Sequence, residues 1–301
     1  MTPQSLPDVL RTFEIPGHVT FSQGKGGLPK IDVTTRASSA QIYLHGAHVT
    51  AFQKIGEPPL LFMSRKSHFA PDQPLRGGVP ICLPWFGPRQ GGPAHGLARI
   101  RTWEPAERPV ANNDRVTIRM RLPKDSLKPE WKGLRTEFIV TVADTLAMEL
   151  VSTNDSPDRD LEIENCLHTY FQISDISDIS IAGLAGLPFD DFAAGAAGAR
   201  NSQNDSVLRI AKETNRVYAN HTGPVEILDK KFGRMIRVEK SGSQSTVVWN
   251  PWTTQKLPDD FDPPEYRHMV CVESGNVKQN RITLSPGETA GLKVVLSTCA
   301  A

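Results

Sequence analysis

The stretch Arg115-Val116-Thr117-Ile118-Arg119-Met120-Arg121 alternates polar and apolar residues at every step. Side chains of a β-strand point alternately to opposite faces, so this pattern predicts a strand with one face in a core and the other in solvent. A similar period of two recurs in segments 135–143, 145–152, 161–173, 234–239, 246–249 and 289–297. No segment shows the pattern of a long amphipathic helix.

Turn-forming residues separate the predicted strands, for instance at 154–157, 241–243 and 285–287. The 24 prolines and 23 glycines interrupt longer runs of either period. Many short strands joined by regular turns are typical of antiparallel sandwiches and barrels, so the sequence predicts an all-β fold. Since no segment repeats at intervals of about 20–50 residues, a propeller is disfavoured.

Two segments fall outside the strand pattern. Residues 192–200 are rich in Ala and Gly, which predicts a flexible loop without chemistry of its own. Residues 251–266 contain four prolines and several acidic residues, which predicts an ordered loop that crosses a sheet edge or a cleft. The strand pattern resumes on both sides of each segment, so we expect residues 1–301 to form a single β domain.

Composition narrows the function classes. The 301 residues are 39% hydrophobic and 22% charged, which supports a sizeable core. The net charge is only +1, which argues against a nucleic-acid binder, because such a protein needs a concentrated basic surface. No apolar run approaches the roughly 20 residues that span a bilayer. Residues 1–8 lack the basic and apolar regions of a signal peptide.

The cysteines Cys82, Cys166, Cys271 and Cys299 lie far apart, and none belongs to a C-x-x-C pair. This pattern is typical of isolated reduced thiols and not of a disulfide framework or a zinc site. We therefore expect a cytoplasmic protein without a resident metal, either an enzyme or a binder of small molecules.

Residues 76–87 and 93–99 form the densest group of chemically active side chains. The group places Arg76, His95 and Arg99 among glycines, which let the backbone approach a ligand closely, and beside aromatic residues able to stack on a sugar ring. The spacing matches neither a phosphate-binding P-loop nor a dinucleotide-binding turn. The group is either a ligand-binding cluster or a glycine-rich turn with surface arginines.

Segment 161–173 places His168 on the polar face of a predicted strand, between Cys166 and Tyr170. If that face is open to solvent, His168 is an ordinary surface histidine. If it lines the concave side of a sandwich, His168 is placed to donate or accept a proton near neutral pH.

A carboxylate, Glu273, ends the short apolar strand that is predicted at 269–273, just before a Ser-Gly turn. A charge at a strand end is commonly just solvated, but a carboxylate base and a histidine acid would also complete a proton-transfer pair. His45 and His48 are three residues apart and would point to opposite faces of a strand, so they are a poor metal pair. The G-x-S-x-G signature of a serine nucleophile is absent.

Five segments in order resemble one family: Arg76-Gly-Gly-Val-Pro-Ile-Cys with Pro-Trp-Phe-Gly87, His95-Gly-Leu-Ala-Arg99, Leu167-His-Thr-Tyr-Phe171, Val247-Val-Trp-Asn-Pro-Trp252 and Met269-Val-Cys-Val-Glu273. The family is the glucose-6-phosphate 1-epimerases, the hexose-6-phosphate mutarotase branch of the aldose 1-epimerase superfamily. The resemblance runs from about residue 40 to 275. It implies a large antiparallel sandwich of the galactose mutarotase-like kind, with a concave sugar-binding face.

The resemblance also implies roles for individual residues. His168 corresponds to the family's catalytic acid and Glu273 to its base, while Arg76 and Arg99 match binding arginines and His95 flanks the pocket. Asn215 stands where the family tends to have aspartate, and Ala94 where it often has glutamine, which affects hydroxyl recognition. We expect a cytoplasmic monomer that interconverts the anomers of a hexose 6-phosphate with no cofactor, and that binds neither nucleic acid nor membrane.

Two other functions remain open on the same fold. A carbohydrate-binding or sugar-phosphate-sensing protein would keep the arginines and aromatic residues but would not need both His168 and Glu273. A polysaccharide lyase would need a basic groove for an acidic polymer, which the near-neutral charge does not favour.

Overall fold

The computed structural model describes residues 6–112, 114–124 and 126–301. Residues 1–5, part of the segment that we expected to lack a signal peptide, lie outside the described residues. The described helices are short: α1 is Asp8–Arg11, and the 3-10 helices are η1 Lys25–Gly27, η2 Ala98–Ile100, η3 Pro129–Trp131, η4 Pro263–His268 and η5 Lys278–Asn280. Among them we find none with the length and apolar character that a membrane-spanning helix requires.

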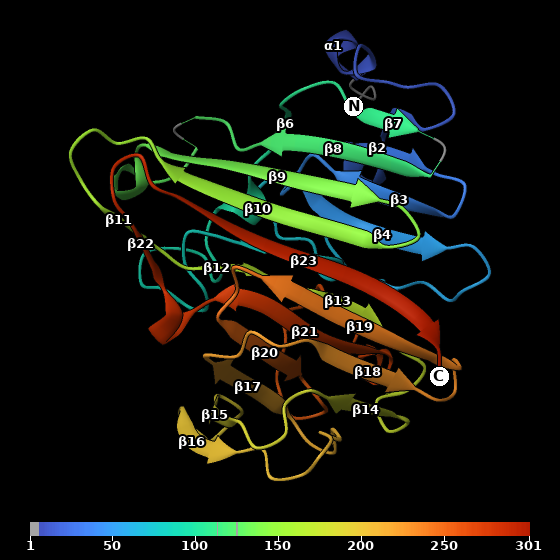
Figure 1. Cartoon of the computed structure of the whole chain (residues 1–301), viewed down its shortest axis with the longest axis vertical. Helices are drawn as coiled ribbons and strands as arrows, with labels where there is room; N and C mark the ends of the chain where they lie inside the picture. Colours follow the sequence, from blue (N-terminus) through green and yellow to red (C-terminus); the bar gives the residue numbers. More distant parts are fainter. Residues whose placement is uncertain (1–5, 113, 125) are drawn as a thin grey trace.

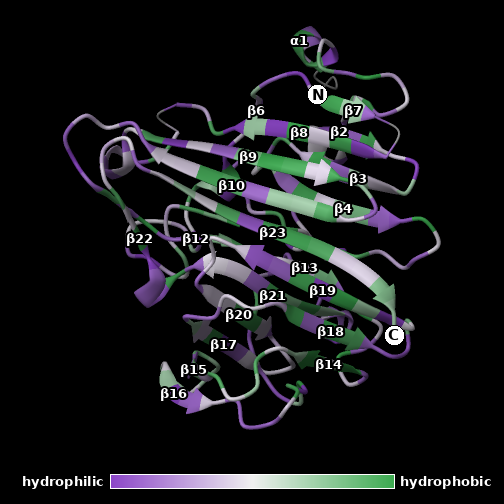
Figure 2. Ribbon diagram, in the orientation of Figure 1, coloured by the Kyte–Doolittle hydropathy of each residue, from purple (hydrophilic) through white to green (hydrophobic). Residues whose placement is uncertain are grey.

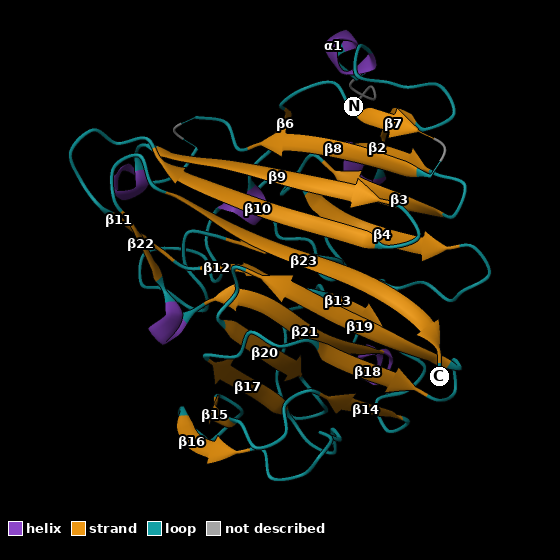
Figure 3. Ribbon diagram, in the orientation of Figure 1, coloured by secondary structure: helices purple, strands orange, loops and turns teal. Residues whose placement is uncertain are grey.

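The described strands pair antiparallel in four sheets (Figure 1 and Figure 3). A four-stranded sheet has the order β1 Val19–Gln23, β2 Pro29–Thr34, β3 Ser38–Tyr43 and β4 His48–Lys54. A nine-stranded sheet has the order β14 Ile179–Ala182, β18 Val225–Asp229, β19 Arg234–Ser241, β23 Thr289–Ala300, β10 Leu146–Asn154, β9 Leu134–Val142, β8 Arg115–Arg121 and β6 Glu104–Pro105, and β7 Val110–Asn112 also pairs with β8.

The site-bearing sheet has eight strands in the order β16 Ala199–Ser202, β15 Pro188–Asp191, β17 Thr214–Ala219, β20 Ser245–Asn250, β21 Met269–Asn276, β12 Asn165–Leu167 and β5 Ile81–Cys82, with β13 Tyr170–Gln172 also on β21. A small sheet pairs β11 Leu161–Ile163 with β22 Ile282–Leu284. The prediction of an all-β antiparallel fold is confirmed.

The main core lies between the nine-stranded sheet and the four- and eight-stranded sheets. Phe138 of β9, Ile42 of β3 and Phe171 of β13 belong to one contiguous cluster of buried apolar side chains. Figure 2 shows hydrophobic and hydrophilic residues alternating along β8, β9 and β10, as expected for strands with one solvent face. Figure 1 shows β2–β4 behind these long strands, which agrees with a sandwich.

Most strand predictions are confirmed within a few residues at the strand ends, as β8, β9, β10, β19, β20 and β23. The single strand that we predicted over 161–173 is wrong, because the chain there divides into β11, β12 and β13. His168 and Thr169 interrupt it: the backbone N–H of His168 donates to the Pro80 carbonyl, and that of Thr169 turns back to the Leu167 carbonyl. The interruption is local, because β12 and β13 both pair with β21 and keep the same register on it.

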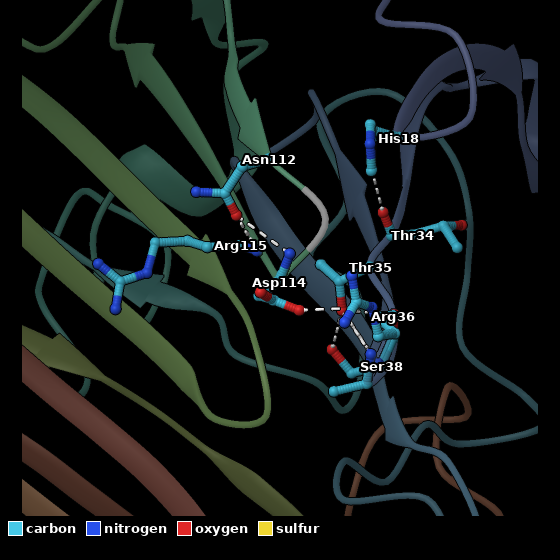
Figure 4. A network of polar contacts seen from close by, with 9 residues as sticks. His18, Thr34, Thr35, Arg36, Ser38, Asn112, Asp114 and Arg115 are labelled. Atoms are coloured by element: carbon cyan, nitrogen blue, oxygen red, sulfur yellow. Dashed lines mark hydrogen bonds and ion pairs between the residues drawn. The ribbon is translucent and has the colours of Figure 1, made fainter.

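A polar network joins the β2–β3 turn to the start of β8, near one edge of the sandwich (Figure 4). The Asn112 Oδ1 atom accepts bonds from the backbone N–H groups of Asp114 and Arg115. Asp114 then faces Arg36 at 3.6 Å, in an exposed ion pair. Exposed pairs contribute little to stability, so the network orders two turns and does not hold the sheets together.

Candidate active site

The strands β20, β21 and β12 of the eight-stranded sheet are buried on both faces. Val272 of β21 points into the main core, whereas Cys271 and Glu273 on either side of it point to the opposite face. On that face Glu273 lies across from Val247 of β20, and Cys271 lies across from Trp249. We call this the site face.

Glu273 lies inside β21 and not at a strand end, which corrects the sequence prediction. The Ser274-Gly275 pair continues the strand because β12 pairs against it. A Cβ atom on Gly275 would lie 2.5 Å from the Asn165 carbonyl oxygen and 2.8 Å from the Cys166 Cβ, so only glycine permits this approach. The approach places the Cys166 thiol 3.5 Å from the Glu273 Oε2 atom, to which it donates a hydrogen bond.

His168 lies in the break between β12 and β13 and contacts Glu273 directly. The distance from its Nε2 atom to the Glu273 Oε1 atom is 3.3 Å. The imidazole stacks on the Tyr170 ring, with centroids 4.8 Å apart and an interplanar angle of 12°. Its exposed fraction is 7%, so His168 is not an ordinary surface histidine. The structure therefore brings the two predicted proton-transfer residues together.

Burial dominates the electrostatics of this pair. Burial, aided by the positive charges of Arg99 and Arg76, lowers the pKa of His168 to about 3. Burial raises the pKa of Glu273 well above its usual range, and the Cys166 hydrogen bond and Arg99 offset only part of the effect. Both directions favour the uncharged forms, a neutral imidazole beside a carboxyl group that keeps its proton to a higher pH than usual.

Arg76 is held by a carboxylate that the sequence did not reveal. Its Nε atom donates to both Asp260 oxygens at 3.2 and 3.3 Å, and one terminal nitrogen lies 3.2 Å from the same carboxylate. The other terminal nitrogen donates to the Tyr170 hydroxyl at 3.4 Å. Arg76 is thus charge-paired and oriented, with part of its planar fork of donors still free.

Arg99 differs from Arg76 because no carboxylate within the described residues pairs with it. One terminal nitrogen donates to the Ala94 carbonyl at 2.7 Å, and the buried Nε atom has no hydrogen-bond partner in the part of the chain that the structure describes. The residue is only 8% exposed, and burial lowers the pKa of its guanidinium. A buried cation without a counter-ion is costly, so this position is suited to an anionic ligand.

His95 lies next to the proton-transfer pair, with its ring centroid 5.4 Å from that of His168. The Gly87 N–H donates to the His95 Nδ1 atom at 3.4 Å, so a neutral His95 carries its proton on Nε2. Burial and then the charge of Arg99 hold the pKa of His95 well below its usual range. His95 is therefore a neutral donor beside the pair.

Asn215 lies on β17, across from Trp249 of β20, at the border of the site face. Its side-chain amide approaches the Phe192 carbonyl at 3.5 Å. None of the described contacts joins Asn215 to His168 or Glu273, so the structure places it apart from the other predicted residues.

The sequence analysis assigned no role to three residues of the site, Asp260, Trp249 and Cys166, although Trp249 lies in a family motif and Cys166 lies on the face of His168. Asp260 comes from the proline-rich segment 251–266, whose acidic residues were the only signal. The rings of Trp249 and His168 lie 6.1 Å apart at 76°. Cys166 and His168 are two residues apart in an alternating segment, so the sequence predicts that they lie on the same face. It does not predict the hydrogen bond from Cys166 to Glu273.

One group on the site face could hold a metal ion. His168, Cys271 and Glu273 each offer a ligand atom, and these atoms lie within 4.8 Å of one another. The histidine pair that we judged a poor metal site points elsewhere, since His45 and His48 bond to the carbonyls of Gln73 and Gly77.

An antiparallel sandwich that carries a buried imidazole–carboxylate pair beside the buried guanidinium of Arg99 and the half-buried one of Arg76 fits the class of mutarotase-like sugar isomerases. The chain belongs to the aldose 1-epimerase family, which it matches over residues 29–297. The resemblance inferred from the motifs is confirmed, and the protein is an isomerase.

Individual relatives agree with this assignment. A Cenchrus ciliaris protein, provisionally named a glucose-6-phosphate 1-epimerase, is 33% identical over 282 residues, which cover 90% of this chain and 85% of the relative. An Escherichia coli K12 protein with the same provisional name is 30% identical and covers 80% of this chain and 81% of its own. A Salmonella typhimurium crystal structure, provisionally titled a mutarotase, aligns with a TM-score of 0.87 at 24% identity, covering 98% of this chain and 100% of that one. The last likeness confirms the mutarotase-like fold.

Proposed function

We propose that this protein interconverts the α and β anomers of hexose 6-phosphates, with glucose 6-phosphate as a substrate. The observation that carries the proposal is the direct contact of His168 with Glu273 beside the unpaired guanidinium of Arg99. The provisional names of the curated relatives support the substrate.

The reaction needs two proton transfers and no change of oxidation state. Glu273 removes the proton from the C1 hydroxyl while His168 protonates the ring oxygen, and the C1–O5 bond breaks to give the open-chain aldehyde. After rotation about C1–C2, the C5 hydroxyl attacks the other face of the aldehyde. His168 then takes back its proton, Glu273 returns the other to the new C1 hydroxyl, and both residues regain their starting state.

The phosphate belongs at Arg99 in this proposal. A phosphate dianion supplies the counter-charge that Arg99 lacks, and Arg76 offers its remaining donors from the side. The same anion offsets the positive field that disfavours a charged His168. Substrate binding thereby favours the charged forms of the two residues, a carboxylate base and an imidazolium acid.

The two other predicted residues have supporting roles in the proposal. The Nε2–H of His95 is free to donate to a substrate oxygen near His168. Asn215, at the border of the site face, contacts a sugar hydroxyl only if the substrate reaches past Trp249.

Saturation-transfer NMR tests the function directly. We expect exchange between α- and β-glucose 6-phosphate to be faster with the protein than in buffer. His168→Asn and Glu273→Gln should each lose most of the catalysed rate, since a positioned acid or base contributes about 10²–10⁴-fold. His18→Asn and Glu162→Gln are the matched controls, because the described contacts of these residues, His18 with Thr34 and Glu162 with Arg281, do not involve the pair.

A different result would favour the sensing or binding function. If wild-type exchange equals the buffer rate while glucose 6-phosphate still binds, the protein is a binder, and the isomerase proposal is wrong.

We also propose that residues 1–301 form one cytoplasmic domain, active as a monomer. The main core cluster, which extends in sequence from Leu10 to Leu296, supports one domain. The four cysteines are free thiols, as expected in the cytoplasm.

A further inference from the structure

We propose that His168, Cys271 and Glu273 form a site for a divalent metal ion of intermediate softness, such as Zn²⁺, that reversibly inhibits the isomerase. The inhibitory effect rests on the proposed function, whereas binding of the metal does not.

The three side chains already approach the geometry that zinc requires. Tetrahedral zinc with bonds of about 2.0–2.3 Å separates its ligand atoms by about 3.3–3.8 Å. The contact between the His168 nitrogen and the Glu273 oxygen, at 3.3 Å, meets that spacing. Since all three ligand atoms lie within 4.8 Å of one another, the Cys271 sulfur needs to approach by only about 1 Å, which a small side-chain rotation provides.

The three ligand atoms determine which metal ions the site would prefer. One nitrogen, one sulfur and one oxygen suit Zn²⁺ and Co²⁺, whereas Mg²⁺ and Ca²⁺ prefer oxygen alone. Three protein ligands leave a fourth position for water. On binding, the Cys271 thiol releases its proton to solvent, and Glu273 does so where it holds one. The thiolate and the carboxylate then balance the charge of the ion, and no oxidation state changes.

The surroundings indicate a reversible inhibitor and not a resident metal. A metal-binding histidine normally donates its second ring nitrogen to a partner, and losing such a partner costs about 10–100-fold in affinity. The buried Nδ1 atom of His168 has no partner among the described residues. In addition, the positive charge of the unpaired Arg99 opposes a cation in the same site.

Metal binding and the proposed catalysis exclude each other. A bound ion uses the lone pair of the His168 nitrogen and the charge of Glu273, so neither residue can transfer a proton. Removing the ion with EDTA should restore the rate in full.

Co²⁺ is the probe of choice, because a thiolate ligand gives it a near-ultraviolet charge-transfer band. The parent protein carries Cys299→Ser, since Cys299 is the exposed thiol. We expect one Co²⁺ per chain with that band, and displacement by Zn²⁺. Cys271→Ser should abolish the band and raise the Zn²⁺ concentration for half-inhibition at least tenfold. Cys166→Ser, a buried cysteine outside the ligand set, should retain the band.

Two results would overturn the proposal: no band in the parent protein, or an unchanged band in Cys271→Ser. If Cys271→Ser does not fold, His168→Asn decides, because it keeps the thiol but should weaken Co²⁺ binding at least tenfold. The Co²⁺ titration needs no turnover, so a protein that binds one Co²⁺ but lacks anomerase activity refutes the proposed function alone. An active protein that binds none refutes only the metal site.

Discussion

The side chain of Cys166 is a hydrogen-bond donor beside the carboxylate that we propose as the base. Its thiol donates to the Glu273 Oε2 atom, while the Oε1 atom faces His168. The two contacts on different oxygens fix the rotation of the carboxylate. Cys166 touches no substrate atom in the proposed mechanism, so it is a positioning residue.

Cys166→Ala should therefore lower kcat about three- to tenfold with little change in KM, since a thiol is a weak donor and a hydrogen bond to a charged group is worth at most about 1.5–3 kcal/mol. Cys166→Ser should restore most of the rate because the hydroxyl donates as well. Anomer exchange rates and circular dichroism check both variants. A fall in kcat that is equal in the serine and alanine variants would show that volume matters and not the hydrogen bond.

We expect substitutions of the two arginines to have different effects on substrate binding, because among the described residues Arg76 pairs with a carboxylate and Arg99 does not. Arg99→Ala should raise the KM for glucose 6-phosphate by about one to two decades, the equivalent of losing one charge-assisted hydrogen bond. Arg76→Ala should have a smaller effect, since Asp260 already balances part of its charge. Neither change should matter much for free glucose.

The ratio of kcat/KM for glucose 6-phosphate to that for glucose measures this effect in each variant. A proportional loss on both sugars, together with a lower Tm, would mean that the arginines only support the glycine-rich turn. The phosphate assignment would then be withdrawn.

At the scale of elements, strands with one solvent face could be predicted from the sequence because polarity alternates along them. The strand predicted at Arg115–Arg121 has those bounds in the structure. The end of β21 is harder to predict from the sequence, because every residue of the strand is buried and a change of polarity therefore does not mark where it ends. The sequence predicts a turn at the Ser274-Gly275 pair, because glycine is common in turns. The structure shows another reason for the glycine, which is the close approach of β12.

The residues of the site could be predicted better than their contacts. The motifs gave His168, Glu273, Arg76 and Arg99, but the pairings depend on strand register and on distant loops. The bond between Arg76 and Asp260 joins residues 184 positions apart, and nothing local in either segment reveals the other.

Gly275 tests whether the junction of β12 and β21 positions the pair. Gly275→Ala should destabilise the protein by about 1–3 kcal/mol, because its Cβ would overlap β12 and force the two strands apart. It should also slow anomer exchange, since His168 follows β12 directly. Gly291→Ala is the matched control: the added Cβ would meet only the Glu149 side chain, at 3.7 Å. Denaturant unfolding and exchange rates measure both effects, and equal stability of the two variants would contradict the prediction.

At the scale of the whole molecule, the sandwich buries histidines in their neutral form. His48 of β4 is fully buried, with its Nε2 atom 2.7 Å from the Gly77 carbonyl oxygen, which fixes the proton on that nitrogen. Burial, in spite of this hydrogen bond, lowers the pKa of His48 to about 3. Burial also lowers the pKa of His221, to about 4.

The neutral burial of His48 predicts that stability falls in mild acid. An unfolded histidine has a pKa of about 6.5, so the unfolded chain takes up a proton as the pH falls through that value while folded His48 stays neutral. The stabilisation is complete above pH 6.5 and is lost progressively below it. Between pH 7.5 and 5.0 the loss is about 2 kcal/mol from His48 alone. Denaturant unfolding at these two pH values measures the loss.

His48→Gln keeps a donor for the Gly77 carbonyl but cannot titrate. Its loss of unfolding free energy over the same pH interval should therefore be smaller by about 2 kcal/mol, even if the variant is less stable at both pH values. The same pH dependence in variant and wild type would show that the folded protein protonates His48, and that this part of the core is open to water.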